Sequence, residues 1–355
     1  MKLGILTFYN GPNYGGFWQA RGLQNYLTEL GYQAEMIPYL NCTHLANIKF
    51  KPCVYRRPMK FIHDWSKYRA ISFACKRSGW KFPDSDPQRI FWANYDVIVV
   101  GSDVVWNLTE GGFGQDKIYY GCIQTKKVLR WISYAPSIGS MPEDFVLPDK
   151  CRLCLSTFAA VSARDEPTAR FVHRAINITP PVLVDPTWLP SKLPTHNFQA
   201  SRATENILLV YAPTISKKTC WKARPIINFA RRHGLRIVAN GIYQPWADEN
   251  IYGGTPESWA DLFRISRFAV CGTLHGALFS IREKLPFVCL ATAASASKLS
   301  TPLKKLGLSD RWLPESEAHR LGDVLSRPID FDRVEYLRVN WAEESARWLK
   351  NALVC

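Results

Sequence analysis

The sequence predicts an α/β protein made of two doubly wound domains that face each other across a cleft. Short continuous apolar runs, typical of parallel strands buried on both faces, alternate with stretches of helical periodicity. The alternation stops in a polar, proline-containing stretch near residues 190–204 and then starts again. The chain of 355 residues is also long enough for two domains of ordinary size.

The first half opens with a strand–helix–strand unit. Leu3–Phe8 is an apolar run, and a turn rich in glycine and asparagine follows at residues 10–16. Apolar residues then recur at helical spacing over 17–30, and Gly31 is typical of the end of a helix. Ala34–Tyr39 supplies the second strand. Such a unit predicts a parallel sheet.

Residues 41–88 interrupt this pattern as a basic and aromatic excursion, which we expect to be irregular and helical only in part. The clearest strand of the chain follows at Tyr95–Gly101, where four β-branched residues stand in a row. Further strands are predicted at 130–135, 159–162 and 182–184.

The second half repeats the alternation. We predict strands at 206–211, 235–240, 268–271 and 287–290, and helices at 221–233, 259–266 and 276–283. The predicted domains are residues 1–195, which include the excursion, and residues 196–355, which end in a C-terminal helix. Two successive halves of this kind indicate two Rossmann-like domains.

Composition excludes several classes of protein. Apolar residues make up 47% and charged residues 21%, which is a globular balance. No apolar stretch approaches the roughly 18 residues that span a bilayer, and the first residues lack the apolar core of a signal peptide. Cys151 and Cys154 form a CxxC pair with no second pair to complete a metal site. We therefore expect a cytoplasmic protein without a metal.

The formal net charge is +15, which favours anionic partners: nucleic acid, anionic lipid or phosphorylated small molecules. The basic residues are scattered in pairs, as at Arg56-Arg57 and Lys126-Lys127, and do not form a tail. None of the usual nucleic-acid-binding motifs is present, so we expect no nucleic-acid partner. The scattered basic pairs therefore have two interpretations: an ordinary solvated surface, or a surface that attracts a membrane or a phosphorylated molecule.

Polar or glycine residues follow four of the predicted strands: Asn10–Gly16, Gly101–Asp103, Ser162–Asp165 and Gly272–Gly276. Ligands of open parallel sheets bind beyond the carboxyl ends of the strands, so we expect these segments to meet at a cleft. Each also has a structural explanation. The glycines of residues 10–16 can simply permit tight packing between the strand and the helix. Ser102 and Asp103 are typical helix caps, Arg164 can form a surface ion pair, and a single histidine such as His275 is often structural.

Taken together, the four segments indicate a site for a small anion. Arg164 can pair with a carboxylate or phosphate through two parallel hydrogen bonds. His275, next to Gly276, can approach a ligand closely and transfer a proton near neutral pH. A helix that begins after Gly272-Thr273 adds backbone N–H groups. The pattern predicts a phosphorylated or carboxylated ligand and acid–base chemistry.

The same segments resemble the polysaccharide pyruvyltransferase family. The resemblance rests on motifs that run in order from residue 3 to about residue 313: Gly4–Phe8 with Asn13-Tyr14-Gly15, Tyr95–Asn107, Tyr134–Gly139, Val161–Asp165, Val184–Leu189, Leu274-His275-Gly276 with Leu285–Val288, and Lys298 ahead of Leu303–Leu308. It implies a two-domain fold similar to that of the GT-B glycosyltransferases.

The resemblance further implies an enzyme that transfers the enolpyruvyl group of phosphoenolpyruvate (PEP) to two hydroxyls of a sugar. The sugar belongs to a surface polysaccharide or its precursor, the products are a pyruvate ketal and phosphate, and no further cofactor is needed. His275 would be the general acid or contact the leaving phosphate, and Arg164 would hold the donor. The expected donor site also contains Gly272, Thr273, Gly276 and Lys298, and the expected acceptor side contains Asn13, Tyr14, Gly15, Ser102 and Asp103.

The chain departs from the family pattern at Thr273, where some members have an arginine. Arg282 and Lys284 are near in sequence, although a helix would turn them to solvent. The alternative function is a GT-B-type glycosyltransferase with a nucleotide-sugar donor, for which Glu257 is a candidate ribose contact. A non-catalytic binding protein is a second alternative.

The resemblance also implies a role in surface-polymer assembly, with an acceptor that is free, nucleotide-linked or lipid-linked. A basic face that includes Arg56, Arg57, Lys126 and Lys127 would then bring the protein to the anionic inner face of the membrane as a peripheral partner.

Overall fold

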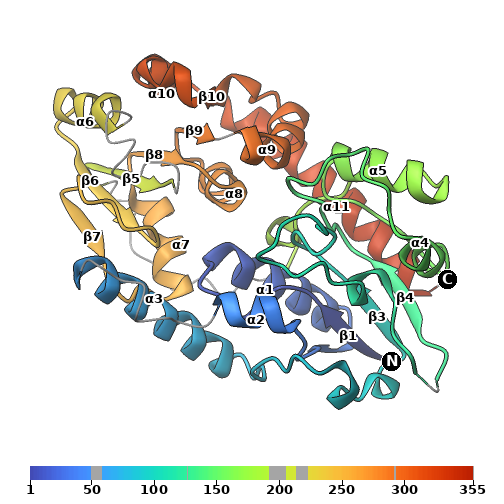
Figure 1. Cartoon of the computed structure of the whole chain (residues 1–355). Helices are drawn as coiled ribbons and strands as arrows, with labels where there is room; N and C mark the ends of the chain where they lie inside the picture. Colours follow the sequence, from blue (N-terminus) through green and yellow to red (C-terminus); the bar gives the residue numbers. More distant parts are fainter. Residues whose placement is uncertain (49–57, 126, 192–204, 213–222, 292, 355) are drawn as a thin grey trace.

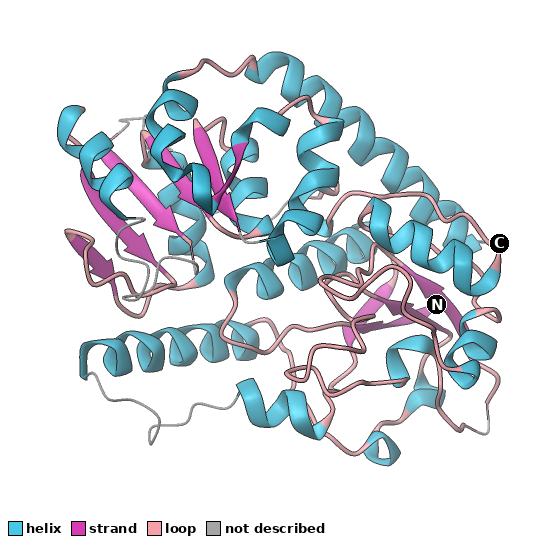
Figure 2. Ribbon diagram, turned by 45° about the horizontal axis from the view of Figure 1, so that its top comes forward, coloured by secondary structure: helices cyan, strands magenta, loops and turns pink. Residues whose placement is uncertain are grey.

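The computed structural model describes residues 1–48, 58–125, 127–191, 205–212, 223–291 and 293–354 (Figure 1). Two parallel β-sheets form the centres of two halves of the molecule, and helices pack around both (Figure 2). None of the helices in these ranges is long and apolar enough to cross a membrane. The predicted domain boundary at residue 195 lies outside the described residues.

The N-terminal half is built on four parallel strands in the order β2-β1-β3-β4. Leu3 in β1 pairs with Ala34 on one side and with Val97 on the other. The chain therefore crosses to the opposite side of β1 when it passes from β2 to β3. The carboxyl ends of β1 and β3 mark the place where a doubly wound sheet binds ligands. The strands are β1 Lys2–Leu6, β2 Gln33–Met36, β3 Val97–Val100 and β4 Arg130–Ser133.

The C-terminal half has six parallel strands in the order β10-β9-β8-β5-β6-β7, and its crossing point lies between β5 and β8. Two of these strands, β7 and β10, were not predicted, because three residues are too few to show a periodicity. The strands are β5 Ile207–Tyr211, β6 Arg236–Asn240, β7 Glu249–Ile251, β8 Phe268–Cys271, β9 Phe287–Ala291 and β10 Trp312–Pro314.

The helices are more extensive than the sequence predicts. The excursion at 41–88 contains α2 and the long helix α3. The described α-helices are α1 Tyr14–Glu29, α2 Cys42–Ile48, α3 Pro58–Arg77, α4 Asp149–Leu155, α5 Glu166–Ile176, α6 Ala223–Arg232, α7 Pro256–Ile265, α8 Leu274–Arg282, α9 Ala293–Lys305, α10 Leu321–Ser326 and α11 Phe331–Val354. Short 3-10 turns occur at Pro87–Arg89, Trp92–Asn94, Ile118–Tyr120, Pro186–Trp188, Ser309–Arg311 and Glu315–Arg320.

The strands predicted at 159–162 and 182–184 are single β-bridges in the structure, Ile132 to Ala160 and Ala163 to Val182. Backbone hydrogen bonds join β4 to the first of these segments, from the Ala159 amide to the Trp131 carbonyl (2.8 Å) and from the Ser133 amide to the Ala160 carbonyl (3.0 Å), and serine side chains extend the contact. The Ser133 hydroxyl accepts a hydrogen bond from the Ser162 amide (2.9 Å), and the Ser162 hydroxyl donates to the Ser133 carbonyl (2.8 Å). Backbone pairing therefore continues beyond β4, but as two isolated bridges and not as the two predicted strands.

The two halves meet through aromatic residues of α1. The Tyr14 ring stacks on Trp259 at 5.4 Å, and its hydroxyl donates to the Gly254 carbonyl (2.6 Å). One turn later, Trp18 Nε1 donates to the Pro256 carbonyl (3.0 Å). These side chains are buried, so the two halves pack directly against each other beside the cleft.

The last helix, α11, returns to the N-terminal half (Figure 1). Trp341 Nε1 donates to the Val182 carbonyl, and the Ser345 hydroxyl accepts from the Val184 amide. The Arg130 guanidinium donates to the carbonyls of Ala352 and Leu353 near the end of the helix, where cations are favoured. The sequence-based division assigned this helix to the second domain, but these contacts tie it to the first.

Candidate active site

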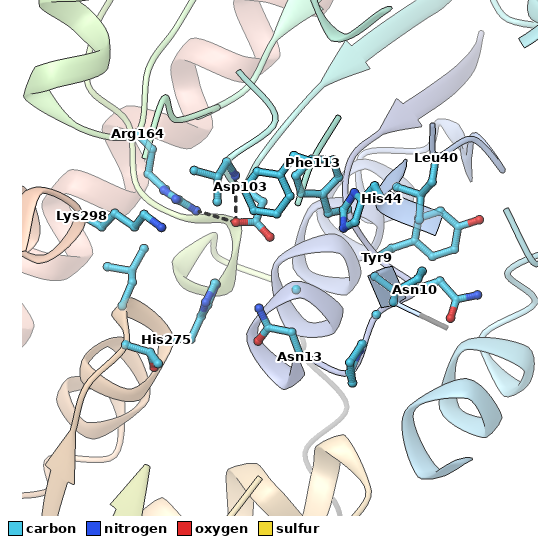
Figure 3. Close-up of a pocket in the computed structure, with 18 of the residues that line it drawn as sticks. Tyr9, Asn10, Asn13, Leu40, His44, Asp103, Phe113, Arg164, His275 and Lys298 are labelled. Carbon is cyan, nitrogen blue, oxygen red and sulfur yellow. Dashed lines mark hydrogen bonds and ion pairs between the residues drawn. The ribbon is translucent and has the colours of Figure 1, made fainter. Parts of the chain in front are cut away.

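A cavity of about 410 Å³ lies between the two halves, at the carboxyl ends of the central strands (Figure 3). Cationic side chains gather at one end and aromatic side chains at the other. The lining residues include Phe8–Asn13, Leu40, His44, Ile48, Asp103, Val104, Phe113, Arg164, Gly272–His275 and Lys298. Both sheets therefore contribute their predicted ligand-binding edges to one cavity.

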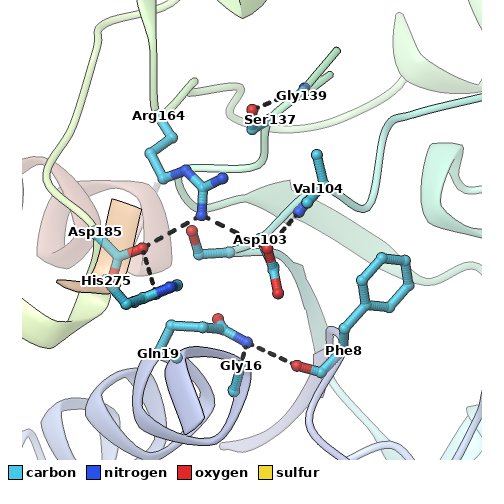
Figure 4. A network of polar contacts seen from close by, with 12 residues as sticks. Phe8, Gly16, Gln19, Asp103, Val104, Ser137, Gly139, Arg164, Asp185 and His275 are labelled. Atoms are coloured by element: carbon cyan, nitrogen blue, oxygen red, sulfur yellow. Dashed lines mark hydrogen bonds and ion pairs between the residues drawn. The ribbon is translucent and has the colours of Figure 1, made fainter. Parts of the chain in front are cut away.

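Arg164 forms the centre of the cationic end. Its side chain is only 5% exposed, and one terminal nitrogen lies 3.3 Å from Asp185 Oδ2 and 3.8 Å from Asp103 Oδ1 (Figure 4). Its Nε is buried, and among the described residues it has no hydrogen-bond partner. The two carboxylates hold the guanidinium in place, and its remaining N–H groups can bind an anion.

Asp185 joins Arg164 to His275. His275 Nε2 lies 3.4 Å from Asp185 Oδ2, which is an ion-pair distance but outside hydrogen-bond geometry. Burial alone would raise the pKa of Asp185, but attraction to His275 and Arg164 and the Thr187 amide outweigh burial and hold that pKa at about 2. Asp185 is therefore ionised at neutral pH and can balance a positive charge on either neighbour.

The His275 ring lies against α1 of the other half, at Gly15. A Cβ atom at Gly15 would lie 2.2 Å from His275 Nδ1 and 2.3 Å from its Cγ, well inside contact distance. Gly15 does not line the cavity; it makes room for the imidazole that does. The helix starts here because the Asn13 side chain accepts a hydrogen bond from the Gly15 amide (3.0 Å), three residues before the predicted start.

The N-terminus of α8 also opens on the cationic end. Thr273 is the N-cap residue, and its hydroxyl accepts a hydrogen bond from the Gly276 amide (3.1 Å). Lys298 reaches the same end from α9. Burial and the nearby Arg164 charge lower the pKa of Lys298, and no ion pair to it is found among the described residues. A helix N-terminus, an arginine and a lysine here are groups that could together hold an anion.

The opposite end is a wall of aromatic and apolar side chains from the N-terminal half. His44 packs edge-on against Phe8 at 4.3 Å and against Phe113 at 5.2 Å between ring centroids. Burial lowers the pKa of His44 to about 4, so its ring is neutral at neutral pH. Leu40 and Ile48 complete this surface. The cavity therefore suits a ligand that is anionic at one end and has an apolar face at the other.

Comparison with known proteins identifies the family. Residues 13–293 match the family model described as polysaccharide pyruvyl transferase, which covers well over half of the chain. The chain belongs to this family. No curated protein matches it.

Solved structures share the fold of this pyruvyltransferase-family protein at low sequence identity. A MnaA–UDP co-structure from S. aureus has a TM-score of 0.53 at 12% identity and covers 99% of this chain and 96% of that one. The spinosyn rhamnosyltransferase SpnG with thymidine diphosphate has a TM-score of 0.51 at 11% identity, and the match covers 99% of each chain. Arabidopsis thaliana UGT89C1 with UDP-L-rhamnose has a TM-score of 0.51 at 10% identity, and the match covers 98% of this chain and 97% of that one. The fold is therefore of the two-domain GT-B type.

The structure brings together most of the predicted site. Arg164, Gly272, Thr273, His275 and Lys298 line the cationic end of the cavity as a group, together with Asn13 and Asp103. Asp103 has a φ of 76°, and its Oδ1 accepts a hydrogen bond from the Val104 amide (2.9 Å). This fixed carboxylate stands between the cationic and aromatic ends (Figure 3).

Four predicted site residues have structural roles and do not line the cavity: Gly15, as described above, and Ser102, Tyr14 and Gly276. Ser102 is fully buried, and its hydroxyl donates to the Ala135 carbonyl (2.6 Å). Tyr14 is buried in the interface between the halves. Gly276 faces the interior of its own half, where a Cβ would lie 3.1 Å from Cys271. Its amide is taken by the Thr273 cap.

The residues proposed to compensate for Thr273 do not reach the cavity. Arg282 is at the far end of α8, where it lines a separate cavity of about 240 Å³; its side chain is mostly buried, contrary to the expectation that it faces solvent. Lys284 pairs with Asp332 at 3.1 Å. Glu257, the candidate ribose contact, forms an ion pair with Arg77 and does not line the main cavity.

Two features of the site are not predicted from the sequence. Asp185 belongs to the Val184–Leu189 motif, but an acid before Pro186 is typical of a helix cap, and it does accept a hydrogen bond from the Thr187 amide. Nothing in the sequence singles out His44 or Phe113, which reach the cavity only through tertiary packing. Cys151 lies on α4, and no group of side chains suited to hold a metal ion occurs among the described residues.

Proposed function

We propose that this protein transfers the enolpyruvyl group of PEP to two hydroxyls of a sugar and forms a pyruvate ketal. The observation that carries the proposal is the group of Arg164, His275 and Lys298 at the N-terminus of α8, in a protein of the pyruvyltransferase family. PEP carries a phosphate and a carboxylate on adjacent atoms, and a compact cationic site matches that charge distribution.

The donor would bind at the cationic end. Arg164 and Lys298 would neutralise its phosphate and carboxylate, and the first amides of α8 would add hydrogen bonds. His275 would donate a proton to C3 of the enol, so that C2 becomes an oxocarbenium-like centre. Asp185, which is ionised and lies 3.4 Å from the imidazole, would position the ring.

The sugar would bind between Asp103 and the aromatic wall. One hydroxyl would attack C2, the phosphate would then leave with the electrons of its C2–O bond, and the second hydroxyl would attack C2 and close the ketal. Of the two hydroxyl protons, one replaces the proton given to C3 and the other leaves with phosphate. Asp103 stands at the boundary of the two ends and would accept the first proton. The apolar face of a sugar ring suits the rings of Phe8 and Phe113.

Calorimetric titration with PEP tests the donor without knowledge of the acceptor. We expect saturable PEP binding by the wild type and weakening by about tenfold to hundredfold in Arg164→Ala, because each charge-assisted hydrogen bond contributes about 1.5–3 kcal/mol. Arg282→Ala is the matched control, since Arg282 lies outside the cavity, and it should bind PEP like the wild type. His275→Ala should bind PEP but lose turnover.

Uridine diphosphate sugars are titrated alongside, because the alternative is a glycosyltransferase with a nucleotide-sugar donor. Binding of a nucleotide sugar without binding of PEP would refute the proposed donor. Equal PEP affinity in the wild type and Arg164→Ala would refute the proposed donor site.

A further inference from the structure

The outward side of α3 carries an unusual surface. Met59, Ile62, Trp65 and Phe73 have exposed fractions of 49%, 44%, 41% and 63%. They recur at spacings of three, three and eight residues, so they fall on one side of the helix. With the exposed basic residues of that side, Arg69 and Lys76, they form what we call the α3 outer face: Met59, Ile62, Trp65, Arg69, Phe73 and Lys76.

The opposite side of α3 is fixed to the rest of the protein. The His63 ring packs edge-on against Tyr243 and Tyr252, and Lys67 Nζ donates to the Gly241 carbonyl, both in the C-terminal half. Cys75 Sγ donates to the Tyr9 carbonyl in the N-terminal half. Figures 1 and 2 agree in placing α3 along the edge of the molecule. The outer face therefore cannot turn inward without breaking contacts to both halves.

The charges of α3 are strongly one-sided. The helix has five lysines and arginines against a single acid, Asp64, which pairs with Lys60. The Arg69 guanidinium stacks on the Trp65 ring at 4.9 Å, and this leaves the pair as one cationic and aromatic unit at the surface. Exposed apolar side chains flanked by tryptophan and basic residues are typical of helices that lie in the interfacial layer of an anionic membrane.

Two other strongly exposed apolar residues on helices are isolated from the α3 outer face. Leu153 on α4 and Tyr336 on α11 are 60% and 67% exposed, but they lie on different helices. Scattered residues of this kind are normal on a protein surface. The basic pairs named from the sequence are no better placed: Lys127 is held by Asp96 and the Tyr95 carbonyl, and Arg56, Arg57 and Lys126 lie outside the described residues.

We propose that the α3 outer face docks this protein on an anionic membrane surface. The apolar side chains enter the interfacial layer while Arg69 and Lys76 contact the lipid headgroups. The proposal does not depend on the donor or acceptor of the reaction, because none of these residues lines the active-site cavity.

Vesicle flotation with the full chain tests the proposal. We expect the wild type to bind vesicles of phosphatidylcholine with about one-third phosphatidylglycerol and to bind pure phosphatidylcholine weakly. Trp65→Ser/Phe73→Ser should lower the affinity for anionic vesicles by about tenfold or more, through lost apolar burial. Arg69→Glu/Lys76→Glu should lower it by a similar factor and remove its salt dependence.

Leu153→Ser/Tyr336→Ser is the matched control, because it removes two equally exposed apolar side chains elsewhere, and it should float like the wild type. All variants should melt at the wild-type temperature, which shows that they fold. Absence of wild-type binding to anionic vesicles, or binding that both α3 variants retain, overturns the proposal. Sedimentation that shows a wild-type dimer and monomeric α3 variants also overturns it, because the face would then be an interface between two copies.

Discussion

Gly15→Ala tests whether the two halves meet as closely at the active site as the structure indicates. Gly15 lies in α1 with helical backbone, so alanine is conformationally acceptable and only space opposes it. The added Cβ would lie 2.2 Å from His275 Nδ1, whereas an ordinary contact is about 3.5 Å, so the ring or the helix must shift by about 1.3 Å. A forced shift of this size lowers the stability by about 1–3 kcal/mol. The higher helix propensity of alanine over glycine offsets up to about 1 kcal/mol of that loss.

The assay is denaturant unfolding of a set of variants. Gly16→Ala is the matched control, since its Cβ would meet nothing closer than 3.5 Å and should leave stability unchanged or slightly raised. His275→Ala removes the two ring atoms closest to the new methyl group, so the cost of Gly15→Ala should fall by about 1 kcal/mol or more in that background. A displaced imidazole would also slow turnover by about a hundredfold.

Two results would refute this reasoning. One is a Gly15→Ala variant as stable as Gly16→Ala. The other is a penalty for Gly15→Ala that is the same with and without the His275 side chain. Either result would mean that α1 and α8 are farther apart at this point than the structure has them.

Three further predictions concern the charges of the site. The pKa of Asp185 is lowered to about 2, so its ionisation stabilises the fold fully above about pH 4. In urea unfolding, we expect the difference in stability between the wild type and Asp185→Asn to shrink by about 2 kcal/mol as pH falls from 4 to 2. A difference that stays constant over this interval would contradict the prediction. His44 is buried in its neutral form with a pKa of about 4, so the wild type should lose stability as pH falls from 6.5 to 4. His44→Phe should lose about 3 kcal/mol less stability than the wild type over that interval. Equal slopes of unfolding free energy against pH in the two proteins would exclude the effect. Arg164→Lys keeps the charge but not the planar fork, so its PEP affinity should fall between those of the wild type and Arg164→Ala, and wild-type affinity would show that charge alone suffices.

The sequence located the cationic end of the site because that end follows from topology. Residues after parallel strands gather at one edge of a sheet, so Arg164, Thr273 and His275 could be assigned to one place without knowledge of any contact. The close approach of Gly15 to His275 could not be derived in this way, since it depends on how two domains dock. The same holds for the aromatic wall, where His44 belongs to a helix that the sequence does not clearly predict.

The excursion at 41–88 is helical in part, as predicted, but its sequence does not locate α3, and the cause is physical. A helix is recognised by an apolar stripe on one side and polar residues on the other. In α3, Ile71 and Ala74 are buried on the inner side while Trp65 and Phe73 are exposed on the outer side, so apolar residues occur all around the helix. The periodicity is thereby lost from the sequence, and the segment looks irregular. The exposed apolar side chains that hide the periodicity of α3 are the same ones on which the proposed membrane contact depends.

Under the proposed function, the surroundings of Thr273 explain how this chain would hold an anionic donor without the arginine that some family members have at that position. Threonine caps α8 through its hydroxyl, which arginine cannot do, and the cap aims the helix N-terminus at the cavity. The cations come instead from Arg164 in the N-terminal half and Lys298 in the C-terminal half. Under the proposed function, the donor would therefore contact both halves at once.

This division makes the site depend on the contact between the halves. Asp185 and Gly15 belong to the N-terminal half, and both lie against His275 of the C-terminal half. Separation of the two sheets would take His275 away from its carboxylate and would also separate Arg164 from Lys298. An anion bound between Arg164 and Lys298 would hold the two halves together, so PEP should raise the melting temperature of the wild type. The rise should be smaller in Arg164→Ala, in proportion to the lost PEP affinity.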